Sequence, residues 1–255
     1  RKSILSLAVR GHLAEQKALD IGGNSGVASD HFLPRDWKWI RGGDLAEFVD
    51  PQPSHRTPPE YPAGIPYVGY SDITSEGIID FANARKVAPQ VMAEHRERYV
   101  LKQGDFIIGK IGTIGQPFVL PQPFDYTLSA NIILIQPNSA LILSEYLVIF
   151  FSSPFAEAAL RKQQTNSTHA VFGIKKAREF LVPLPPLAEQ RRIVAKVEQL
   201  MALVDALETQ LAASRATAAN LLSALVAELT GTANDGKVSM PSASTTGRRG
   251  RPKKS

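Results

Sequence analysis

The sequence predicts an α+β fold in which a mixed globular domain precedes one long, coiled-coil-like helix. From residue 32 to about residue 182, short runs of β-branched and aromatic residues alternate with proline and glycine, and a helical pattern appears only late. That order favours α+β over a repeated β-α-β sheet. From residue 187 to residue 240 there is no proline, and apolar residues recur at steps of three and four.

The elements follow in order along the chain. Residues 1–16 are expected to form a helix, because Ile4, Leu5, Ala8, Val9 and Leu13 lie near one helical face. The glycine- and serine-rich residues 17–31 read as a linker. Strands are expected over 37–40, 66–70, 105–111, 116–120 and 131–136, and a helix over 144–163. Residues 4–9 also echo residues 221–226, either as the end of a second long helix or by coincidence.

The long helix is predicted over 187–229, which makes it roughly 65 Å long. Its apolar seam includes Ile193, Val197, Leu200, Val204, Leu207 and Leu211. The same phase continues to residue 225. One helix cannot exclude water from such a seam, so these positions are predicted to assemble with another helix.

The net charge of +5 lies entirely beyond residue 231, where six basic residues stand against one acidic residue. The composition of residues 232–255 predicts a disordered basic tail. Within it, Arg-Gly-Arg-Pro resembles an AT-hook, whose thin backbone would lay Arg249 and Arg251 along a narrow A·T minor groove. Nonspecific attraction of a basic tail to DNA is the alternative.

Several classes of chemistry find no support. The chain has no cysteine, which fits a reducing compartment and makes the cytoplasm the default location. It has neither an 18-residue apolar run nor a signal-peptide pattern, and its first residue is not methionine, which indicates a fragment of a longer chain. No catalytic residues, cofactor or metal site are predicted. The histidines lack metal-ligand spacing and are expected at the surface: His12, His31, His55, His95 and His169.

One segment has the spacing of a phosphate-binding loop without its context, and another has side chains that suit contacts with DNA. Residues 104–110 have the spacing of a phosphate-binding loop but lack the following Ser or Thr and helix, so Gly109, Gly112 and Gly115 are taken as hairpin turn and bulge positions. Residues 162–169 gather amides and hydroxyls beside a lysine, which suits base edges and phosphate. A plain polar surface loop is the alternative. A phosphate-facing patch and scattered solubility charges are both open for Arg85, Lys86, Arg96, Arg98 and Lys102.

A family resemblance rests on residues 182–194, which read VPLPPLAEQRRIV. This proline-rich lead into a long helix resembles the junction that opens the conserved helical region of type I restriction-modification specificity subunits. Upstream, residues 33–37, 65–73 and 102–108 resemble the target recognition domain of that family in the same order. The resemblance covers about residues 33–229.

The resemblance implies a division into domains. Complete subunits of the family usually hold two recognition domains, each followed by a long helix, with the two helices antiparallel; this chain has one of each. Residues 1–16 then resemble the end of a preceding spacer helix, 17–31 a linker, 32–182 the DNA-binding target recognition domain and 183–231 the spacer and assembly helix. The chain is either the second half of a subunit or a natural half-subunit that pairs with a second copy.

The resemblance also implies a non-catalytic function. The domain would read part of a split DNA site, and methylation subunits that bind S-adenosylmethionine and flip out the target adenine would clamp around the helices. A restriction subunit would join for cleavage. DNA contacts are expected from Lys110, Thr113, Lys162, Gln163, Gln164, Asn166, Ser167 and Thr168. The alternatives are a standalone AT-rich DNA-binding or chromosome-associated protein and an enzyme with scattered catalytic residues.

Overall fold

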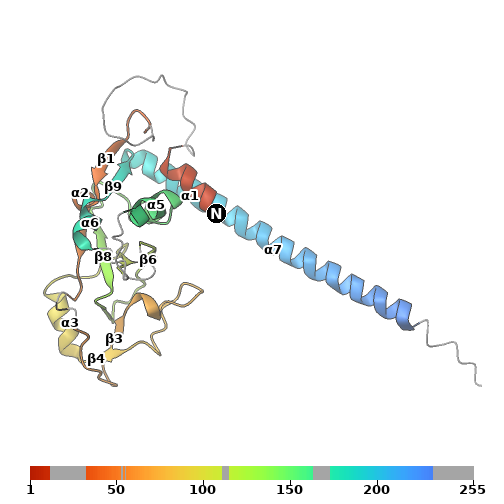
Figure 1. Ribbon diagram of the computed structural model, residues 1–255, viewed down its shortest axis with the longest axis horizontal. Coiled ribbons are helices and arrows are strands. Elements are labelled where there is room, and N and C mark those ends of the chain that lie inside the picture. Colours follow the sequence, from red (N-terminus) through yellow and green to blue (C-terminus); the bar gives the residue numbers. More distant parts are fainter. Residues whose placement is uncertain (12–32, 53, 55, 111–114, 163–172, 232–255) are drawn as a thin grey trace, which may run out of the picture. The chain divides into compact units, whose positions relative to one another are not determined.

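The computed structural model describes residues 1–11, 33–52, 54, 56–110, 115–162 and 173–231 (Figure 1). The chain divides into two compact units, Arg1–Ala202 and Leu203–Ser255. The first unit combines helices with three small sheets, so the predicted α+β class is confirmed. None of the described helices is both long and apolar enough to cross a membrane.

A four-stranded antiparallel sheet lies at the centre of the first unit. Its order is β2 (Ala46–Val49), β8 (Ile132–Pro137), β5 (Phe106–Gly109) and β6 (Pro117–Val119). Three of these strands match the runs expected over 105–111, 116–120 and 131–136; β2 was not predicted. The antiparallel β5–β6 pair confirms the hairpin, and Gly115 has a φ of 73°, the left-handed conformation expected of a turn glycine.

Both faces of this sheet are covered. On one face Phe106, Ile108 and the alternate residues of β8 pack with the helices, and on the other Ile107 and Leu134 pack against a smaller sheet. A strand that is buried on both faces carries apolar residues on both of them. This is why β5 and β8 read as unbroken apolar runs rather than as alternating patterns.

Helices cover the first face. They are α1 (Lys2–Val9), α4 (Ser144–Phe151), α5 (Pro154–Lys162) and the first turns of α7 (Leu187–Gly231), and α1 lies beside α4 and α5 (Figure 1). The single helix expected over 144–163 is wrong in one respect, because it breaks into α4 and α5. The break has a local cause: Pro154 has no N–H to continue α4 but suits a first helical position, and the Ser153 hydroxyl accepts the N–H of Ala156 at 3.2 Å.

The second face is covered by a three-stranded sheet and its neighbours. Strand β3 (Ile65–Val68) lies between β4 (Lys86–Val87), to which it is antiparallel, and β7 (Thr127–Leu128), to which it is parallel. A short 3₁₀ turn η1 (Tyr70–Asp72) follows β3, and α3 (Pro89–Arg96) follows β4. Of these elements, the sequence indicated only β3.

The remaining short elements join the start of the domain to its end. Strand β1 (Lys38–Arg41) pairs antiparallel with β9 (Leu181–Leu184), with Trp39 opposite Pro183. Helix α2 (Gly42–Leu45) follows β1 and packs on α6 (Ile174–Glu179). The proline-rich lead into the long helix is therefore in part a strand.

The side chain of Gln190, in the first turn of α7, closes this junction. It is fully buried, and its Oε1 accepts the N–H of Leu143 at 2.8 Å. Its Nε2 donates to the carbonyl oxygens of Pro185 at 2.9 Å and Leu141 at 3.1 Å. One amide thus ties the long helix to the segment that precedes α4.

Helix α7 runs over Leu187–Gly231, so the 45-residue helix confirms the prediction over 187–229. Two of the six predicted assembly residues, Ile193 and Val197, are buried in the core of the first unit and are therefore covered by the chain itself. Leu200 and Val204 are half-buried. The apolar surface open to a partner helix thus begins later on α7 than expected. Its most exposed large members are Leu203, Leu207, Leu211, Leu221, Leu222, Leu225, Val226 and Leu229.

Candidate nucleic-acid interface

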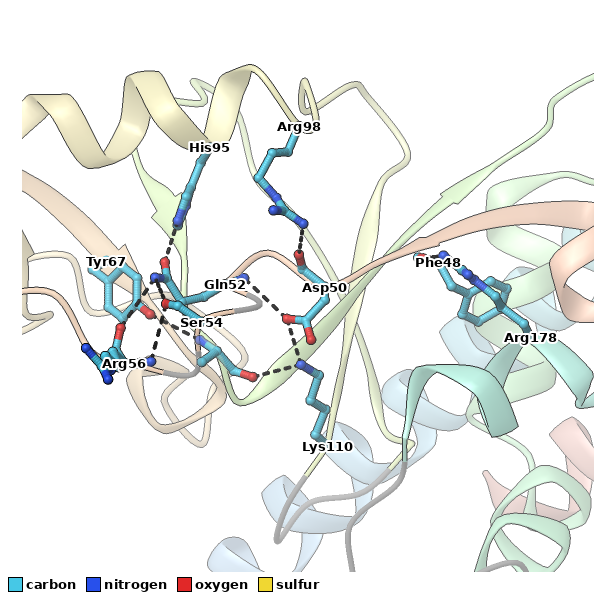
Figure 2. Close-up of polar contacts among 11 residues, drawn as sticks. Phe48, Asp50, Gln52, Ser54, Arg56, Tyr67, His95, Arg98, Lys110 and Arg178 are labelled. Carbon is cyan, nitrogen blue, oxygen red and sulfur yellow. Dashed lines mark hydrogen bonds and ion pairs between the residues drawn. The ribbon is translucent and has the colours of Figure 1, made fainter.

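Lys110, the first of the predicted DNA contacts, comes directly after β5 and turns inward. Its side chain is 7% exposed, and its Nζ lies 2.9 Å from Oδ1 of Asp50, the residue after β2 (Figure 2). The same Nζ donates to the carbonyl oxygen of Ala130 at 2.9 Å. The ammonium group therefore ties together the ends of two strands that flank β8. A direct contact of Lys110 with phosphate stays a prediction, since it would require this ion pair to open.

A chain of hydrogen bonds runs from the core to the segment after β2. Nε2 of His95 lies 2.5 Å from Oε1 of Gln52, which can only accept, so this nitrogen carries the proton (Figure 2). Nδ1 then accepts from the Thr127 hydroxyl at 2.6 Å, and Thr127 in turn accepts from the Tyr99 hydroxyl at 3.2 Å. At the outer end, Nε2 of Gln52 donates to Oγ of Ser54 at 2.8 Å. Every bond in this chain points outward, from Tyr99 to Ser54.

His95 corrects the expectation that the histidines lie at the surface, because it is 4% exposed. It shares the inner face of α3 and the turn after it with Met92 and Tyr99, at steps of three and four. Burial lowers the pKa of His95, with the Arg98 charge adding to the effect. Burial also raises the pKa of Tyr99 to about 12. Both groups are therefore neutral at pH 7, as the hydrogen-bond chain requires.

The depressed pKa of His95 predicts a stability that falls in mild acid. As pH drops below the ordinary histidine value of 6.5, the unfolded chain takes up a proton before the folded chain does. The free energy of unfolding should therefore decrease from that pH down to the lower, folded-state pKa. Thermal unfolding across this range would measure the effect. An equally steep dependence in a His95→Asn variant would show that other groups cause it.

Side-chain bonds also fix the backbone of the segment that holds Asp50, Gln52, Ser54 and Arg56. The Asp50 carboxylate accepts the N–H of Gln52 at 3.3 Å, and Oγ of Ser54 accepts the N–H of Arg56 at 3.4 Å. Arg98 donates to the carbonyl oxygen of Asp50 at 3.5 Å. Ser54 and Arg56 remain exposed. Sequence reasoning named none of these four residues.

The side chains of the other predicted DNA contacts are not described by the structure. Lys162 is the last residue of α5, and its side chain is not described. The rest lie outside the described residues: Thr113, Gln163, Gln164, Asn166, Ser167, Thr168, Arg249 and Arg251. In the part of the chain that is described, no group of three or more His, Asp and Glu side chains is placed to hold a metal ion.

The comparisons with known proteins bear on the whole domain. The family model for the type I restriction modification DNA specificity domain matches residues 34–214. The chain belongs to this family. The match extends from the segment before β1 to well within α7, so it includes both the mixed domain and the long helix.

Individual relatives agree with this assignment to the type I specificity family. The chain is 24% identical over 237 residues to the EcoBI specificity subunit of Escherichia coli, covering 89% of this chain and 48% of that protein. It is 39% identical over 88 residues to the EcoKI specificity subunit of E. coli K12, covering 34% of this chain and 19% of that one. The chain thus spans about half the length of the EcoBI specificity subunit.

A solved structure from work on complex assembly and conformational transition of the type I R-M system has a similar fold. Its TM-score is 0.57 at 23% sequence identity, and the match covers 86% of this chain and 50% of the solved chain. At this identity the likeness concerns the fold alone.

Proposed function

We propose that this chain is the DNA sequence-recognition part of a type I restriction-modification methyltransferase complex. The domain before residue 183 reads one part of a split target site, and α7 helps to dock the methylation subunits. The chain itself performs no chemistry and uses no cofactor. The single observation that carries the proposal is the family match across residues 34–214, which joins the mixed domain to the long helix.

The apolar face of α7 supports the docking role. Leu207 and Leu211 are 56% and 51% exposed, although they continue the spacing of Ile193 and Val197, which are buried. Exposed leucines at heptad spacing are typical of a helix that packs on another helix. The partner helix comes from a missing half-subunit or from a second copy of the chain, and a restriction subunit joins the same complex.

The loops and the tail carry the DNA contacts in this proposal. Residues 111–113 and 163–168 hold the hydroxyl and amide groups that suit base edges, with Gln164 and Thr168 as the preferred readers. The basic tail adds general affinity for DNA without choosing the sequence, because it carries the entire net charge. Arg249 and Arg251 are the residues that would enter an A·T minor groove.

Recovery of partners and mapping of methylated adenines test the function together. A tagged full-length chain, purified from the cells that produce it, should bring down an adenine methyltransferase. Deletion of the chain should remove methylation at one split sequence throughout the genome, while its return should restore that pattern. A standalone AT-rich binder would purify without a methyltransferase, and its deletion would leave the methylated sequences unchanged. Methylation or cleavage by the purified chain alone would instead favour an enzyme.

A further inference from the structure

We propose that Ser54 and Arg56 contact DNA, and that Lys110 acts on DNA binding as a positioning residue through Asp50. The inference rests on the proposed DNA-reading function and concerns how one exposed segment of the domain is held for it. The segment is the stretch after β2, from Asp50 to Pro58, of which residues 53 and 55 lie outside the described residues.

Four side chains from distant parts of the chain hold this stretch. Lys110 pairs with the Asp50 carboxylate, and Arg98 donates to the Asp50 carbonyl oxygen. His95 donates to Gln52, which in turn donates to Ser54 and to the carbonyl oxygen of Arg56 at 3.3 Å. At the far end, Nη2 of Arg85 donates to the carbonyl oxygen of Pro58 at 3.0 Å. The backbone is therefore fixed at both ends and in the middle.

Holding a surface segment by a largely buried ion pair costs free energy. Moving Lys110 and Asp50 out of water carries a desolvation penalty that their attraction only partly offsets, so a buried pair adds little net stability. Replacing such an ion pair by an apolar pair of similar volume is often neutral for stability. What the ion pair and the His95–Gln52 bond supply instead is one defined conformation of the segment, which matters where exposed groups must meet a partner in register.

The exposed side chains of this segment, Ser54 and Arg56, offer hydrogen-bond donors. Oγ of Ser54 accepts two N–H groups, from Gln52 and Arg56, so its own hydrogen is directed away from both. Within the described part of the chain, the exposed Arg56 guanidinium has no hydrogen-bond partner. A hydroxyl donor beside a guanidinium suits an acceptor-rich, negatively charged partner, and in a DNA-reading domain these acceptors are phosphate oxygens or the O6 and N7 of guanine.

The same geometry favours an indirect role for Gln52 and Lys110. Both amide donors of Gln52 are used within the segment, and its oxygen faces His95. The Lys110 ammonium is 7% exposed and faces Asp50. Direct and indirect roles for Lys110 lead to opposite expectations for Asp50. If charges near DNA simply add, removal of the Asp50 carboxylate strengthens binding; if Asp50 holds the segment, its removal weakens binding.

The test uses the full chain with the subunits that copurify with it, and a random-sequence duplex library sequenced before and after selection. Wild type should enrich one sequence, and Arg56→Ala should weaken binding to it about tenfold or more and lower the salt-dependence slope by about one. Arg192→Ala, at an exposed arginine of α7, is the charge-matched control and should have little effect. Equal behaviour of these two variants would overturn the DNA contact at Arg56.

The positioning role is tested by a double-mutant cycle. Asp50→Ala and Lys110→Ala should each weaken binding several-fold with an unchanged salt slope, and the double variant should be no weaker than either one. Asp50→Asn, which keeps an acceptor for Gln52, should recover part of the affinity and guards against a variant that fails to fold. Tighter binding by Asp50→Ala, or a lower slope for Lys110→Ala, would overturn the role. If wild type enriches no sequence, the proposed function itself fails.

Discussion

Replacement of Gln190 by alanine should lower the free energy of unfolding by about 2–4 kcal/mol, since three hydrogen bonds are lost at about 0.5–1.5 kcal/mol each. The change leaves the N–H of Leu143 and the carbonyl oxygens of Leu141 and Pro185 without this partner. The side chain is fully buried, so a cavity adds to the loss. The effect should be large because one side chain joins α7 to the segment before α4.

Denaturant unfolding of the full chain measures this difference. Gln199→Ala is the matched control, because it makes the same substitution on the same helix at an exposed position, where Oε1 of Gln199 accepts from Lys196 at 3.2 Å. The control should change the free energy of unfolding by less than about 0.5 kcal/mol. If the two variants are equally stable, the Gln190 side chain does not hold the junction.

Leu207→Asp should prevent assembly through α7, with little effect on the fold of the first unit. A charge placed in an apolar helix interface costs several kcal/mol, which corresponds to a loss of a hundredfold or more in the association constant. Leu207 is 56% exposed in this chain, so the substitution buries no charge until a partner helix packs on it. Copurification of the methyltransferase and methylation of the target sequence should both be lost.

Ala206→Asp is the control for this experiment. It introduces the same charge one residue earlier, at an exposed position outside the heptad seam. Its copurification and methylation should remain close to wild type. Leu200→Asp is less informative, because Leu200 is half-buried at the edge of the first unit and its change would also disturb that unit. Normal assembly of Leu207→Asp would mean that α7 does not form the interface.

The parts of the fold that could be predicted are those whose pattern repeats along the sequence. The seam of α7 repeats over many turns, and β5 and β8 are unbroken apolar runs because both faces of their sheet are covered. Strands β4 and β7 have two residues each, too few for any period to appear. The seam also could not indicate where the domain stops covering it, because Ile193 and Leu207 fit the same pattern although only Ile193 is buried.

The candidate site was harder to predict because its residues are single and far apart. Gln52 and His95 are separated by 43 positions and meet only once α3 packs beside the segment after β2. A lone histidine in a short helix has no spacing that distinguishes a buried position from an exposed one. Lys110 was found as a candidate, but its partner was not, since nothing around Asp50 indicates that its carboxylate faces β5.

The outward direction of the bonds from Tyr99 to Ser54 couples the exposed end of the segment after β2 to buried residues of the domain. Thr127 is 2% exposed, and its hydroxyl donates to Nδ1 of His95, whose Nε2 in turn donates to the amide oxygen of Gln52. A valine at position 127 would remove the donor to Nδ1 of His95 and so break this sequence of bonds at its inner end. Variation in the interior can therefore alter the chemistry presented at the surface while every surface residue stays the same.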